Sequence, residues 1–79
     1  MIDLSKLDLQ GRDLSGANFA KANLRRCNLT KTNLRGTDFS GADLSYCDMT
    51  GAETEGADFT DAVLTGVAGF NIAAHKTEQ

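Results

Sequence analysis

The chain has 79 residues and a formal net charge of −3, so it forms one domain at most and its overall charge does not suit nucleic-acid binding. Leu, Ile, Val and Phe are scarce enough that composition alone does not separate the chain from a disordered one. There is no secretory signal, membrane-spanning run or lipidation motif, so we expect a cytoplasmic protein without membrane contact.

A five-residue repeat runs from Ile2 to Gly66 in thirteen consecutive blocks. Each block reads as a small residue, Asp or Asn, Leu or Phe, a polar residue, and Gly or another polar residue. A helix needs apolar residues every three to four positions and a strand needs them every two, so neither suits this period. The chain must instead turn a corner once per block, so that all block centres point into one interior.

Similar residues recur at a spacing of twenty, which predicts four blocks per coil and a little over three coils. The aromatic block centres Phe19, Phe39 and Phe59 form one such column, and Cys27 and Cys47 belong to another. The centre and the small residue two positions before it should face inward. The last position should be a corner with positive φ, and the Asp or Asn should point outward and bond to nearby backbone.

Over residues 2–66 this pattern resembles the A(D/N)LXX motif of the pentapeptide-repeat family. The resemblance implies an all-β fold, a right-handed quadrilateral β-helix. Family members are often without known activity. Some that resist gyrase-directed drugs or toxins act as DNA-shaped partners of topoisomerases, usually as dimers.

The first coil departs from the pattern because Ile2, Leu7 and Arg12 are large where small residues are expected. This favours an N-terminal cap over an apolar docking end, with Arg12 bending outward to avoid burial of its charge. Thr54 replaces an apolar block centre, and local tolerance in the last full coil explains it better than a site.

The sequence divides into a β-helix at residues 1–66 and a C-terminal cap with a frayed tail at residues 67–79. Phe70 and Ile72 keep apolar character without the period. An open solenoid end needs a cap or a partner. In the drug-resistance relatives the C-terminal end forms the dimer, so capping and dimerisation by Phe70 and Ile72 are both open.

Catalytic chemistry is not indicated, and we expect no catalytic, cofactor-binding or metal site and no small-molecule substrate. His75 is the only histidine, and no motif places a partner beside it. Cys27 and Cys47 should stack inward in adjacent coils, where both a disulfide and two thiols are geometrically allowed. A cytoplasmic location favours reduced, buried thiols.

Charge is distributed unevenly along the chain. Residues 1–36 carry seven basic and three acidic side chains, whereas residues 37–79 carry one basic and eight acidic. The basic half places Lys6, Arg25 and Arg26 on one face together with Tyr46, and Arg26 can stack on Tyr46 in the next coil. These four residues, with Phe70 and Ile72, are the candidate interaction residues.

We therefore predict a non-catalytic scaffold or protein-interaction module that binds a protein partner or associates with itself through a coil end. The alternative is a DNA-mimic regulator of a type II topoisomerase such as gyrase. Three coils at the strand spacing give a rod only about 16 Å tall, against about 34 Å for one turn of duplex. The basic N-terminal half also argues against DNA mimicry.

Overall fold

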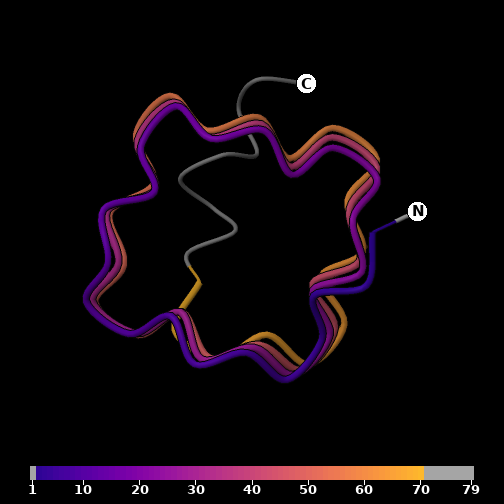
Figure 1. The fold of residues 1–79 in the computed structure, drawn as a ribbon, viewed down its shortest axis with the longest axis horizontal. Coiled ribbons are helices and arrows are strands. Elements are labelled where there is room, and N and C mark those ends of the chain that lie inside the picture. Colours follow the sequence, from indigo (N-terminus) through magenta and orange to yellow (C-terminus); the bar gives the residue numbers. More distant parts are fainter. Residues whose placement is uncertain (1, 71–79) are drawn as a thin grey trace.

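The structure is a computed structural model that describes residues 2–70. These residues wind into a four-sided coil whose successive turns lie directly above one another (Figure 1). The described part of the chain contains no helix and no strand longer than a single bridge residue. Every bridge is parallel and joins residues twenty apart, from Asp3 with Asn23 to Asp48 with Ala68. The predicted four blocks per coil are confirmed.

The coils are joined by backbone hydrogen bonds centred on the Asp or Asn of each block. The Asn23 amide donates to the Ile2 carbonyl at 2.8 Å, and the Leu4 amide donates to the Asn23 carbonyl at 2.7 Å. At the following corner, the Lys6 amide donates to the Arg25 carbonyl at 2.9 Å. The same arrangement recurs around the coil, so backbone polar groups between two coils are satisfied without long strands.

Each corner is a tight turn in which the third residue has positive φ. The Arg12 amide donates to the Leu9 carbonyl at 3.2 Å, and Gly11 between them has a φ of 74°. A positive φ at the third position is the mark of a type II turn. Seven of the thirteen corners from position 6 to position 66 are glycine, and the other six are Lys6, Lys21, Arg26, Lys31, Tyr46 and Asp61.

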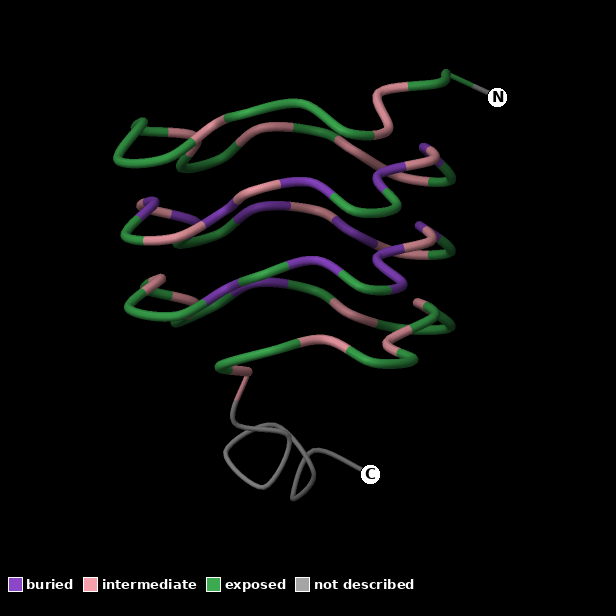
Figure 2. Ribbon diagram, turned by 90° about the horizontal axis from the view of Figure 1, so that it is seen from below, coloured by how far each residue is buried: buried purple, intermediate pink, exposed green. Residues whose placement is uncertain are grey.

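The core is a narrow column of block centres and small residues. Leu24, Leu34 and Leu44 are fully buried, and the small residues beside them, such as Ala42, are buried as well. Phe39 stacks between Phe19 and Phe59, with ring centroids 5.7 Å and 5.2 Å apart. Burial is concentrated in the middle coils and falls toward both ends (Figure 2).

The two ends of the described coil differ. At the N-terminal end Ile2 and Leu7 stay 64% and 41% exposed, and Arg12 is exposed. At the C-terminal end the Phe70 ring meets Phe59 edge-on, with centroids 4.8 Å apart. This contact extends the phenylalanine column by one ring, as a C-terminal cap would. Ile72, His75 and the rest of the predicted cap and tail (residues 67–79) beyond Phe70 lie outside the described residues.

The Asp and Asn side chains point outward and brace the turn that follows each of them. Asp48 Oδ1 accepts hydrogen bonds from the Thr50 amide at 3.0 Å and the Thr50 hydroxyl at 2.7 Å. Ser40 makes the same contact, with its hydroxyl 2.7 Å from Asp38 Oδ1, and is half-buried, whereas Thr50 is exposed. The turn hydrogen bonds thus recur from block to block, while the burial of the residue after the block centre varies.

Candidate interaction surface

Three of the predicted site residues lie at one corner of the coil in successive turns. We call Lys6, Arg26 and Tyr46 the basic corner column; their φ values are 66°, 63° and 63°. At the other three corners between residues 2 and 70, no two side chains are adjacent: one corner is all glycine, one has only Lys31 between two glycines, and one has Gly41 between Lys21 and Asp61. The basic corner column is thus the one described corner where side chains follow each other without interruption.

Two members of the column, Arg26 and Tyr46, hold each other in position by direct contact. The Arg26 guanidinium lies over the Tyr46 ring, 5.1 Å from its centroid, which confirms the stacking predicted from the spacing of twenty. The Tyr46 ring in turn covers Gly66, where an added Cβ would lie 2.5 Å from a ring atom. Tyr46 remains 49% exposed, so the ring holds the guanidinium at the surface, with a contact worth about 0.5–1 kcal/mol.

The side chains in this column are not required by the fold. A non-glycine residue in the left-handed region costs about 1–2 kcal/mol, and glycine occupies seven other corners of the same coil. Two cations in successive coils also repel each other. Backbone strain that the fold does not need supports a functional hypothesis. Such strain persists only where another interaction offsets its free-energy cost.

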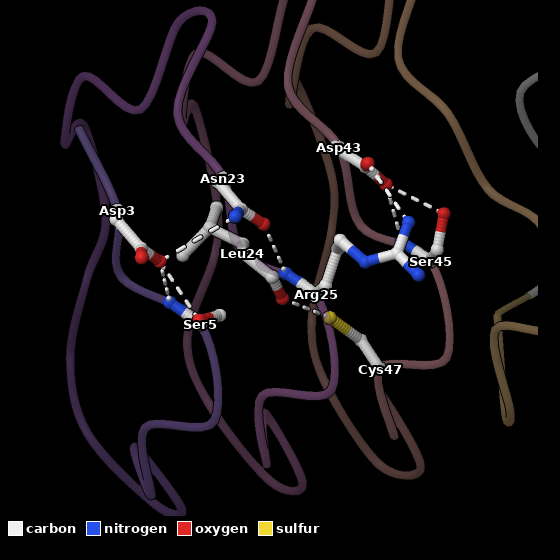
Figure 3. A network of polar contacts seen from close by, with 8 residues as sticks. All are labelled: Asp3, Ser5, Asn23, Leu24, Arg25, Asp43, Ser45 and Cys47. Carbon is white, nitrogen blue, oxygen red and sulfur yellow. Dashed lines mark hydrogen bonds and ion pairs between the residues drawn. The ribbon is translucent and has the colours of Figure 1, made fainter. Parts of the chain in front are cut away.

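Arg25 lies next to this column but is already paired. Its Nη1 is 3.3 Å from Asp43 Oδ2 in the next coil (Figure 3). The pKa of Asp43 is lowered by the Ser45 hydroxyl, then by the Ser45 amide, and also by Arg25. Lys6 and Arg26, in contrast, make no ion pair with any residue among residues 2–70. The pKa of Asp3 is lowered first by Ser5 and also by the charge of Lys6, so Lys6 has a longer-range attraction to this carboxylate without forming an ion pair. The cations of this surface that are outside ion pairs therefore belong to the corner column.

Charge changes from coil to coil rather than gradually along the axis. The first coil, residues 2–21, has three acidic and three basic side chains. The second, residues 22–41, has four basic and one acidic, and the third, residues 42–61, has six acidic and no basic. Arg25 with Asp43, and Arg35 with Glu53 at 2.8 Å, tie the second coil to the third. The first coil is neutral, so the excess positive charge of residues 1–36 lies in the second coil and not at the N-terminal end.

The two cysteines are buried in the interior of the coil and pack there. Both are free thiols with 1% exposure, and their sulfur atoms donate to backbone carbonyls of the preceding coil: Cys27 to Leu4 at 3.0 Å and Cys47 to Leu24 at 2.8 Å. The pKa of Cys47 is raised by its contact with the Cys27 thiol and by burial. Each thiol thus fills the small inward position and uses its one donor there.

Metal-ligand and membrane signals are absent from the described residues. No group of three or more His, Cys, Asp or Glu side chains within residues 2–70 is arranged to hold a metal ion. None of these residues forms a helix with the length and apolar character needed to cross a bilayer. The interaction candidates Lys6, Arg25, Arg26 and Tyr46 come together on one surface, while Phe70 lies at the C-terminal end of the coil.

The outward carboxylates make stability depend on pH. The pKa of Asp48 is lowered by the Thr50 hydroxyl and then the Thr50 amide, and Ser15 acts on Asp13 in the same way. A pKa lowered in the folded state means stability that is present above the unfolded value of 3.8 and is lost as pH falls through the folded value. In the preceding coil, the uncharged Asn28 accepts the equivalent hydrogen bonds from the Thr30 amide and hydroxyl.

We therefore expect Asp13→Asn/Asp48→Asn to melt near the wild-type temperature at pH 7 and to lose less stability between about pH 5 and pH 2. Thermal unfolding followed by circular dichroism across this range measures the difference. Identical acid sensitivity in the two proteins would show that these turn-bracing carboxylates do not set the pH response.

Comparisons with known proteins agree with this geometry. The sequence profile of a family described as Pentapeptide repeats matches residues 2–41 and 37–68. A pentapeptide repeat protein from the Arabidopsis thaliana thylakoid lumen is 38% identical, with a TM-score of 0.81 over 82% of this chain. This chain spans only 45% of the length of that protein. The fold is thus a right-handed quadrilateral β-helix.

A second solved structure, a pentapeptide repeat protein from Nostoc PCC 7120, is 28% identical, with a TM-score of 0.51. That match covers 91% of this chain and 75% of the Nostoc protein. Among curated proteins, none is similar enough to count as a relative. The similarity therefore concerns repeat and fold, and the partner-binding residues have to be argued from this chain.

Proposed function

Because this chain belongs to the pentapeptide-repeat family, we propose that it is a non-catalytic scaffold that binds a protein partner through the basic corner column. The observation that carries the proposal is the run of Lys6, Arg26 and Tyr46 at three successive strained corners. Glycine would suit each of these corners better, and the feature that separates them from the other strained corners is that three side chains follow one another without glycine between them.

Three further properties of the described residues support a binding role. The interior is filled by packed side chains, so a binding surface has to lie outside. Arg26 is held over Tyr46, so less side-chain freedom is lost when a partner binds. A cation with an exposed aromatic ring is typical of interface residues, in which Arg and Tyr are enriched. The cytoplasmic location expected from the sequence stays a prediction; the thylakoid lumen is named for the Arabidopsis protein alone.

Substitution of the column by glycine tests this proposal without loss of the fold. Lys6→Gly/Arg26→Gly removes two positive charges and relieves two strained corners. Lys21→Gly/Lys31→Gly removes the same charge from two other corners, where glycine follows in the next coil. We expect a partner crosslinked to the tagged wild-type chain in its own cells to be lost from the first variant and kept by the control.

The physical reason is that a rim cation steers and orients a partner, and its loss slows association by tenfold or more at low salt. Equal capture of the partner by both double variants would contradict a role for the basic corner column. Melting temperatures measured in parallel show whether either variant is misfolded, and we expect both to melt at or slightly above the wild-type temperature.

The DNA-mimic reading has one observation in its favour, the six carboxylates of the third coil. The adjacent second coil carries four cations, so the surface does not present the continuous negative charge of a duplex. A gyrase supercoiling assay separates the two functions. We expect no change in supercoiling; inhibition by the wild-type chain would favour the topoisomerase role.

A further inference from the structure

A second charged column lies on another side of the coil. Asp38 and Asp58 are bridged in adjacent coils, and we call them the acidic column. On the other three sides, the first three coils alternate a carboxylate with an amide in this position: Asp3, Asn23, Asp43; Asp8, Asn28, Asp48; and Asp13, Asn33, Glu53. The amides keep like charges two coils apart, whereas Asp38 and Asp58 face each other across one coil spacing of about 4.8 Å.

The basic and acidic columns are counterparts. Lys6 and Arg26 are the one place in residues 2–70 where two cations occupy successive coils of a column, and Asp38 and Asp58 are the one such place for two carboxylates of the bridge position. None of these four charges is in an ion pair within the described residues. Each column therefore carries a like-charge repulsion that an external opposite charge would remove.

We propose that the partner of the basic corner column is a second copy of this chain, which contributes its acidic column. The inference rests on the proposed function and deepens it by naming the partner. When two copies lie side by side with parallel or antiparallel axes, both columns repeat at the same coil spacing. Lys6 and Arg26 of one copy then meet Asp38 and Asp58 of the other in register, each cation opposite one carboxylate.

An extended acidic peptide fits the basic corner column less well. Its side chains on one face repeat about every 6.6 Å, because alternate residues of a strand share a face, whereas the coils repeat about every 4.8 Å. Another coil of this kind presents carboxylates at the spacing of the cations. Tyr46 adds to the match because it holds the Arg26 guanidinium in a fixed position.

The contact joins two different surfaces, so it is heterologous and does not close into a dimer by itself. One copy keeps a free basic column and the other a free acidic column, and further copies can add. The contact consists of three exposed charges and the half-buried Asp38, with little apolar area, so it is weak and sensitive to salt. The average mass in solution should therefore rise steadily with protein concentration at low salt, without a plateau at the dimer.

Two double variants remove one column each and keep the fold. Lys6→Gly/Arg26→Gly removes the basic charges. Asp38→Asn/Asp58→Asn removes the acidic ones while keeping the oxygen that accepts the turn hydrogen bond, as Asn18 does in the same column. Lys21→Gly/Lys31→Gly and Asp8→Asn/Asp48→Asn change the net charge equally and are the matched controls.

Sedimentation equilibrium of the full chain at about 20 mM and about 500 mM salt gives the readout. We expect association of the wild type and both controls at low salt, its loss at high salt, and monomers for each of the two column variants. A 1:1 mixture of the two column variants should form a heterodimer that does not grow, because one intact column of each kind remains.

A monomeric wild type at low salt, association that persists in all variants, or a mixture that stays monomeric would each overturn the inference. Capture of a different protein through the basic corner column, with a monomeric wild type, would leave the proposed function standing and remove only the second copy as partner. A wild type that is monomeric and also captures no partner through the basic corner column would contradict both the inference and the proposed function.

Discussion

Leu34→Lys is expected to leave the chain unfolded at 25 °C. Leu34 is fully buried in the middle of the coil, with described coils on both sides, so an ammonium placed there has no route to water. Loss of the leucine contacts costs about 2–5 kcal/mol, and an unpaired buried charge costs several more. A domain of this length has a total free energy of unfolding of about 4–12 kcal/mol, so the sum removes most or all of it.

Circular dichroism with thermal unfolding measures this effect, and Gln10→Lys is the matched control. Gln10 follows a block centre in the first coil and is exposed, so the same new charge stays in water. We expect the control to melt within a few degrees of the wild type. Similar melting of Leu34→Lys and the control would refute the inward assignment of the block centres.

Phe39→Ala is expected to lower the free energy of unfolding by about 3–5 kcal/mol, the usual cost of removing a buried phenylalanine. Phe39 has 0% exposure and stacks on Phe19 and Phe59, so its loss leaves a cavity that both neighbours border. In a domain of this size, each kcal/mol corresponds to about 4–8 °C in melting temperature. The variant should therefore melt well over ten degrees below the wild type.

Phe19→Ala provides the comparison for this prediction. Phe19 is half-buried in the first coil and has a ring neighbour on one side only, at Phe39. Its substitution should cost clearly less, because its removal opens toward solvent and leaves no closed cavity. Equal losses from the two substitutions, measured by urea unfolding, would mean that the column is not packed most tightly in its middle.

The features that the sequence predicted are those that repeat. A period of five excludes helix and flat strand, and the spacing of twenty sets four sides, as the bridges between residues twenty apart confirm. The placement of Arg26 over Tyr46 follows from the same count, since stacking brings residues twenty apart into contact. These inferences hold because every coil obeys one local rule and the interior admits only certain sizes.

The departures from the repeat were harder to assess. Six non-glycine corners adopt positive φ, and only their place in the five-residue frame marks them, because their residue types do not favour this conformation. Their conformation is imposed by the coils above and below, whose hydrogen bonds fix the turn whatever residue occupies it.

By itself the sequence determined the four-sided coil, the inward and outward positions and the members of each column, because these depend only on period and residue size. The tertiary structure decided which charges are neutralised. Arg25 forms an ion pair with Asp43 in the next coil, whereas Lys6 and Arg26 form no ion pair within the described residues. An ion pair forms only where a side chain can reach a carboxylate across the coil spacing. The coil spacing is set by the packing of neighbouring coils.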